Sequence, residues 1–150
     1  MIKKIMVAYD GSYEANQAMN IAVNIAKGVS AEIFLVTIFN PFSIFESFET
    51  SDTNAVDTIM EKDRKKLNDI ITQAVKKAED QGIKVQSKVI EDKPGLARIG
   101  PNLVNFAELL DIDLIIMGRR SIGAINRLVL GSVSNYVIQA AKCAVMFVKE

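Results

Sequence analysis

At 150 residues, with 49% hydrophobic and 24% charged side chains, the chain has the size and composition of one soluble globular domain, which excludes a disordered or fibrous protein. Eighteen Lys and Arg residues balance eighteen Asp and Glu residues, so no net field is expected to attract nucleic acid or an anionic membrane. The absence of histidine excludes mechanisms that need imidazole, and the single Cys143 excludes an internal disulfide. We expect one domain over residues 1–150, cytoplasmic, with neither nucleic acid nor a membrane as partner.

The first third of the chain predicts two strands and one helix. An apolar run at residues 5–9 predicts a strand, and Asp10-Gly11-Ser12 then turn the chain into a helix at about 13–27. A continuous apolar run at 33–38 is typical of a strand that is buried on both faces. The irregular segment 40–53 carries four large apolar side chains, at Phe42, Ile44, Phe45 and Phe48. They either cover a pocket or a partner, or pack locally.

The rest of the chain continues the alternation of strands and helices. In chain order we predict a long helix at about 54–81, a strand at 85–90, a helix at about 100–110, a strand at 114–117, a helix from about 131 and a strand at 144–148. Strands separated by helical crossovers pair in parallel, with helices on both faces. We therefore predict an α/β fold with an open, doubly wound, five-stranded parallel sheet. Ligands of such sheets bind beyond the carboxyl ends of the strands, which here means near Asp10, Ile38 and Gly118.

Glycine, serine and arginine gather between the fourth predicted strand and the last helix, at Gly118, Arg119, Arg120, Ser121, Gly123, Arg127, Gly131, Ser132 and Ser134. Bare backbone N–H groups and a helix N-terminus favour phosphate, and arginine can neutralise a polyphosphate. The pattern favours a nucleotide, although glycine loops also form plain turns, and Ser132 could cap the helix instead. No Gly-Lys-Ser/Thr or Gly-x-Gly-x-x-Gly motif follows a predicted strand, which disfavours a P-loop NTPase and a nicotinamide site.

The same loop resembles the ATP-binding signature of the universal stress protein family, Gly-x2-Gly-x9-Gly-Ser/Thr, over Gly118 to Ser132. Residues 5–12 and 143–148 are similar to the family's first and last strands, and length and element order match over the whole chain. The resemblance implies a Rossmann-like sheet of strand order 3-2-1-4-5 and a homodimer paired through the last strand, Ala144 to Val148. It also implies bound ATP, with or without Mg²⁺.

Carried over residue by residue, the resemblance implies a set of nucleotide-binding residues. Asp10 would face the ribose or adenine, beside Ala8, Tyr9 and Ile38. Met117, Gly118, Arg120 and Ser121 would line the ribose and phosphates, and the phosphates would be closed in by Gly131, Ser132, Val133 and Ser134. Ser121 stands where the signature has its second glycine, which places ATP affinity in question. No catalytic residue and no metal ligand are assigned.

Two functions follow from this interpretation. The first is an ATP-binding stress-response regulator, a homodimeric nucleotide-dependent switch with at most slow ATP hydrolysis and a protein partner of unknown identity. The alternative is a nucleotide-free dimerisation module whose signature loop is altered by Ser121. An enzyme of the related adenine nucleotide hydrolase group has less support, because the sequence offers no second catalytic constellation and no histidine.

Single residues carry plainer interpretations beside the functional ones. Asp10 could cap the first helix and touch no ligand. Cys143 begins a predicted buried strand and fits a small core residue better than a nucleophile. Asp111 and Asp113 are predicted to be loop carboxylates without a chemical role.

Overall fold

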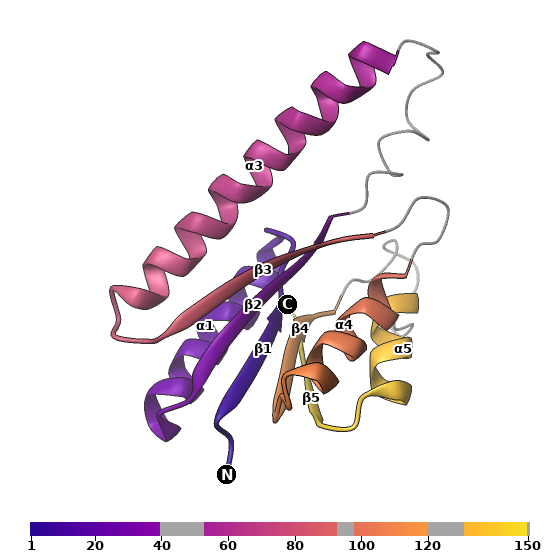
Figure 1. Cartoon of the computed structure of the whole chain (residues 1–150). Helices are drawn as coiled ribbons and strands as arrows, with labels where there is room; N and C mark the ends of the chain where they lie inside the picture. Colours follow the sequence, from indigo (N-terminus) through magenta and orange to yellow (C-terminus); the bar gives the residue numbers. More distant parts are fainter. Residues whose placement is uncertain (40–52, 93–97, 120–130, 150) are drawn as a thin grey trace.

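Strands and helices alternate along the computed structural model, which describes residues 1–39, 53–92, 98–119 and 131–149 (Figure 1). Their order is β1 (Lys4–Ala8), α1 (Tyr13–Val29), β2 (Glu32–Phe39), α3 (Thr53–Glu79), β3 (Val85–Glu91), α4 (Ile99–Leu109), β4 (Leu114–Gly118), α5 (Ser132–Ala140) and β5 (Ala144–Val148). Every predicted strand and helix is present. The predicted bounds were wrong by one or two residues at several ends, since Tyr9 lies beyond β1 and α1 runs on to Val29.

The five strands form one parallel sheet in the order β3-β2-β1-β4-β5, which confirms the predicted fold. The chain builds outward from β1 to β3 on one side and then crosses to β4 and β5 on the other. Ala8, the last residue of β1, is in register with Val36 of β2 and with Met117 of β4, so β1 and β4 end nearly level while β2 runs on to Phe39. The strand order reverses between β1 and β4, which makes this edge the expected place for a ligand.

Helices cover both faces of the sheet, as buried apolar strands require (Figure 1). Alternate residues of β1 point to opposite faces, so Ile5 and Val7 join the core beneath α1 and α3, while Met6 joins the core beneath α4 and α5. The apolar stripe of α1, formed by Ala15, Ala18, Met19, Ala22, Ile25 and Ala26, is buried except for Ile25, which is half-buried. The two cores hold the sheet and its helices together.

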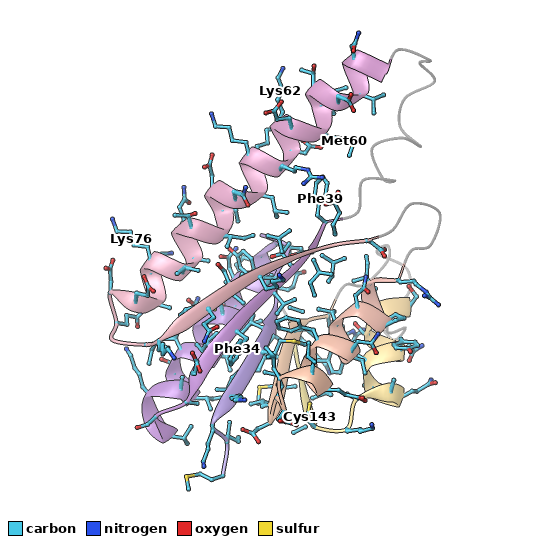
Figure 2. All side chains as sticks on the ribbon, in the orientation of Figure 1. Phe34, Phe39, Met60, Lys62, Lys76 and Cys143 are labelled. Atoms are coloured by element: carbon cyan, nitrogen blue, oxygen red, sulfur yellow. The ribbon has the colours of Figure 1, made fainter. Side chains whose placement is uncertain are left out.

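The long helix α3 extends past the end of the sheet with its N-terminal half (Figure 1). Its 27 residues span about 40 Å at 1.5 Å per residue. Arg64 ties its middle to the carboxyl ends of two strands: the guanidinium lies 5.0 Å from the ring centroid of Phe39 and pairs with Glu91. Phe39 lies between β2 and α3, whereas Lys62 and Lys76 point away from the sheet (Figure 2). On the apolar side of α3, Ile71, Ala74 and Ala78 are buried, whereas Met60 and Leu67 are partly exposed.

Asp113 lies at the amino ends of the strands, directly before β4 and opposite the carboxyl ends. Its Oδ2 accepts the backbone N–H groups of Lys3 at 2.8 Å and Lys4 at 2.9 Å. These two donors hold the pKa of the Asp113 carboxyl below its usual value. The predicted loop carboxylate therefore joins the chain start to the start of β4.

Two further predictions meet the limits of the described chain. The apolar segment 40–53, apart from Thr53 at the start of α3, lies outside the described residues. Within the described part, none of the helices is both long enough and apolar enough to cross a membrane.

Candidate functional site

A cavity of about 370 Å³ opens at the carboxyl edge of the sheet, where the strand order reverses. Its walls come from the ends of β1, β2 and β4, the first turns of α1 and α5, and the start of α4. The volume lies in the range of small-molecule sites. Asp10, Ile38 and Gly118, the three strand ends at which the sequence predicted function, all line it.

The structure brings the predicted site residues together around this cavity. All of those it describes are lining residues: Ala8, Tyr9, Asp10, Ile38, Met117, Gly118, Gly131, Ser132, Val133 and Ser134. Arg120 and Ser121 lie outside the described residues, so their part in the site stays a prediction.

Among the lining residues that the structure describes, sequence reasoning missed six: Ser12, Glu14, Ala15, Val36, Ile99 and Leu103. Val36 could have been found, because it shares a face of β2 with Ile38 two residues on. Ile99 and Leu103 lie four residues apart on α4, so they share one helix face. No local pattern says that this face reaches the cavity.

The turn between β1 and α1 is fixed by side chains that bond to its own backbone. The Asp10 Oδ1 accepts the Ser12 N–H at 3.0 Å, and the Ser12 Oγ accepts the Ala15 N–H at 3.2 Å. Gly11 has φ +79°, a backbone conformation that is strained for any residue with a side chain. Ser12 is therefore the N-cap of α1, and the alternative in which Asp10 caps the helix is wrong. The Asp10 side chain remains exposed at the cavity.

Tyr9 and Asn16 stabilise the same turn through side-chain hydrogen bonds. The buried Tyr9 hydroxyl donates to the Asn16 Oδ1 at 2.9 Å, and the Asn16 amide donates to the Ser12 carbonyl at 2.8 Å and the Gly11 carbonyl at 3.3 Å. Burial, and next the nearby Asp10 carboxylate, raise the pKa of the Tyr9 hydroxyl, so it stays a donor at neutral pH. The turn that presents Asp10 is thus organised without a ligand.

Gly118 lets β4 approach α1 closely. A Cβ at this position would lie 2.6 Å from the Cβ of Glu14, 3.1 Å from its carbonyl carbon and 3.3 Å from the N of Ala15. Two of these neighbours are backbone atoms of α1, so no rotamer change can relieve the contact. The packing of β4 against α1 is therefore sufficient to require glycine at this position.

Helix α5 begins at the cavity, and among the described residues no side chain caps it. It starts at Ser132, and its N-cap is Gly131, which has no side chain to offer. The N–H of Asn135 makes the first helical bond, to the Gly131 carbonyl at 2.9 Å, so helix geometry gives the N–H groups of residues 132–134 no intrahelical acceptor. The alternative in which Ser132 caps α5 is wrong. An uncapped helix start favours an anion.

The rest of the wall that the structure describes is largely apolar and is formed by Ala8, Val36, Ile38, Ile99, Leu103, Met117 and Val133. The charged groups among the described lining residues are the carboxylates Asp10 and Glu14. Carboxylates accept hydrogen bonds from hydroxyl and amino groups. The cavity therefore suits a flat apolar group, a few hydroxyl donors and an anion at the start of α5.

No cluster of three or more metal-ligating side chains occurs in the described part of the chain. Cys143, at the amino end of β5, is half-buried, and burial raises the pKa of its thiol. A raised pKa disfavours the reactive thiolate, which agrees with the predicted packing role.

Comparison with known proteins agrees with this architecture. The profile of the universal stress protein family matches residues 1–149. Universal stress protein MJ0531 of Methanocaldococcus jannaschii is 31% identical over 150 residues, which cover 100% of this chain and 84% of the relative.

Solved structures share the fold. The protein MJ0577 has a TM-score of 0.81 at 24% identity, covering 100% of this chain and 97% of its own. A universal stress protein in complex with cAMP has a TM-score of 0.71 at 20% identity (99% and 97% covered), and one from Archaeoglobus fulgidus in complex with dAMP has 0.63 at 20% identity (99% and 98%). With the profile matched over almost its full length, the chain belongs to the universal stress protein family.

Proposed function

We propose that this chain is a nucleotide-dependent regulatory protein that binds ATP in the cavity at the carboxyl edge of its sheet. One observation carries the proposal: the uncapped start of α5 and an apolar wall share a single cavity. The uncapped helix start can bind a phosphate group, and the apolar wall can bury a purine base. The bound cAMP and dAMP of two structural neighbours support an adenine nucleotide as the ligand.

The charges of the cavity favour one orientation of the nucleotide. Negative carboxylates repel phosphate, so Asp10 and Glu14 suit the ribose hydroxyls or the adenine amino group. The phosphates then extend towards Ser132, where N–H groups without intrahelical acceptors and the helix dipole are favourable. Mg²⁺, when present, accompanies the polyphosphate and needs no site of its own in the protein.

The proposed role is that of a switch with at most slow hydrolysis. The chain contains no histidine to serve as a general base, and the described carboxylates of the cavity are assigned to the nucleoside end. Bound nucleotide would stabilise one state of the protein by its differential affinity. A regulatory protein partner would then bind that state selectively.

The first test is the nucleotide content of the purified protein. The protein is denatured and the released nucleotide is identified by chromatography, after which ATP and adenosine are titrated calorimetrically into emptied protein. ATP or ADP near one per subunit supports the proposal. Empty protein that gives no heat with ATP and Mg²⁺ contradicts it and leaves the nucleotide-free dimerisation module.

A pair of charge variants tests the orientation. Ser132→Asp adds a carboxylate at the start of α5. The helix dipole stabilises this negative charge, so the fold is preserved, but the carboxylate competes with phosphate for the same position. Asn135→Asp adds the same charge to an exposed residue of the same helix that does not line the cavity. We expect Ser132→Asp to weaken the binding of ATP at least about tenfold and to leave the binding of adenosine unchanged. Asn135→Asp should change neither affinity much. Equal losses for ATP and adenosine would exclude this orientation.

We further propose that the active form is a homodimer paired through β5. This strand is one edge of the sheet, and Met146 within it is 37% exposed. An apolar edge strand favours pairing with a second strand. Met146→Lys should give the monomer mass in analytical ultracentrifugation, whereas Val89→Lys, at a 38% exposed position of the other edge strand β3, should leave a dimer. A monomeric wild-type protein at working concentration contradicts the dimer.

A further inference from the structure

A buried carboxylate lies just outside the cavity, at the end of β3. Asp92 follows β3 directly and is only 2% exposed. Removing a carboxylate from water is costly unless other donors replace the water. The donors that surround Asp92 therefore indicate what this residue does.

Two of these donors belong to the start of α4. The backbone N–H of Arg98 donates to the Asp92 Oδ2 at 2.8 Å, and the Asn102 amide donates to the Oδ1 at 3.1 Å. Arg98 is the N-cap of α4, and its own side chain makes no capping bond. Asp92 thus supplies the cap from another element, with a charge that the helix dipole favours.

Asp92 also anchors this cap to the sheet. Its own N–H donates to the carbonyl of Phe39, the last residue of β2, at 2.9 Å. One residue therefore joins the ends of β2 and β3 to the first turn of α4. This places α4 relative to the strand edge at which the cavity opens.

The first turn of α4 is also the part of that helix that forms the cavity wall. Ile99 follows the N-cap directly and Leu103 follows Asn102, and both line the cavity. On its other side the turn packs against α5, since a Cβ on Gly100 would lie 3.0 Å from the Tyr136 Cβ. A displaced α4 start would move the apolar wall and press on the helix whose N-terminus faces the cavity.

We propose that Asp92 is a positioning residue for the nucleotide cavity, which holds the Ile99 and Leu103 wall in its binding geometry. The inference rests on the proposed function, because it assigns Asp92 to that same site. Without the carboxylate, the first turn of α4 samples several positions. Affinity then falls in proportion to the fraction of molecules whose wall is correctly placed.

Asp113 provides a matched control at the opposite edge of the sheet. It too is a carboxylate that accepts backbone N–H groups, those of Lys3 and Lys4. Asp113→Ala therefore removes the same kind of interaction without touching α4. We expect Asp92→Ala to weaken ATP and adenosine by the same factor, about tenfold, and Asp113→Ala to change the affinity less than about twofold although it lowers the Tm.

Two milder variants protect the test against loss of folding. Asp92→Asn keeps an acceptor for the Arg98 N–H, and Asn102 can rotate its amide to pair with the new amide group, so the affinity should stay within about threefold of wild type. Asn102→Ala removes one bond and leaves the carboxylate, and should weaken both ligands about threefold.

Hydrogen exchange in nucleotide-free protein separates this inference from the proposed function. The amides of Asn102, which donates to the Arg98 carbonyl at 2.9 Å, and of Leu103 should exchange faster in Asp92→Ala than in wild type and be unchanged in Asp113→Ala. Unchanged exchange in Asp92→Ala overturns the inference, as does an equal loss of affinity in the two alanine variants. If wild-type protein binds no adenine nucleotide, the proposed function fails, and the exchange result alone decides whether Asp92 positions the wall.

Discussion

The close approach of β4 to α1 at Gly118 gives a sharp prediction of stability. Gly118→Ala places a Cβ 2.6 Å from the Cβ of Glu14, with α1 backbone atoms at 3.1 and 3.3 Å. Overpacking a well-packed core costs about 1–3 kcal/mol. Because helix backbone must move, we expect the upper end, about 3 kcal/mol, which lowers the Tm of a chain this size by about 6–12 °C.

The same substitution elsewhere in the chain serves as the control. Gly28 lies inside α1, and a Cβ there would meet no atom within 4 Å. Gly28→Ala removes only the entropic penalty of a helical glycine and should stabilise the fold by about 0.5–1 kcal/mol. The two alanine variants should therefore differ by about 3–4 kcal/mol with opposite signs relative to wild type.

Urea denaturation followed by circular dichroism measures both variants under two-state conditions. The midpoint should shift in opposite directions at an unchanged m value, since neither change alters the surface that unfolding exposes. Equal midpoints for Gly118→Ala and wild type would show that β4 and α1 are not as close as described. The packing argument for this glycine would then fail.

Three further predictions concern single hydrogen-bonding groups. Ser12→Ala removes the N-cap of α1 and should lower the free energy of unfolding by about 1 kcal/mol in the same urea assay, whereas no loss would argue against the cap. Asn16→Ala leaves the buried Tyr9 hydroxyl without its acceptor and should cost about 1–3 kcal/mol, part of which Tyr9→Phe in that background should restore; no restoration would contradict the pairing. Asp113 has a lowered folded pKa, so its contribution is present above the unfolded value of about 4 and is lost as pH falls through the folded pKa. Asp113→Asn should therefore lower the urea midpoint at pH 7, and its difference from wild type should shrink as the pH falls below about 4. A difference that grows in acid would contradict this argument.

The fold follows from sequence because its determinants are local. The apolar run of β2 and the apolar stripe of α1 each specify their element by the pattern of their apolar residues, and both are buried apart from Ile38 and Ile25, which are half-buried. Helical crossovers then require parallel pairing. The element ends were less accurate, because a cap such as Ser30, with φ 56°, depends on backbone geometry that spacing does not encode.

The site could be predicted only where it coincides with strand ends and the glycine-rich loop. The α4 wall was missed because nothing near Ile99 distinguishes a cavity-facing apolar residue from a core one. Asp113 was assigned no role because its partner Lys3 is 110 residues away in the chain. Ser132 was a candidate cap because local rules accept serine and glycine alike, and the chain begins its helix one residue earlier than that alternative requires.

The glycine signature combines two different physical requirements, and only one of them concerns a ligand. Gly118 is needed for the contact between β4 and α1, so a chain of this fold would keep it with or without a nucleotide. Gly131 is different, because a serine or aspartate there would cap α5 and stabilise it. A helix start left without a side-chain cap at the mouth of an apolar cavity loses that stability unless an anion takes the place of the cap. The start of α5, rather than the first glycine of the signature, is therefore the stronger argument for a bound phosphate.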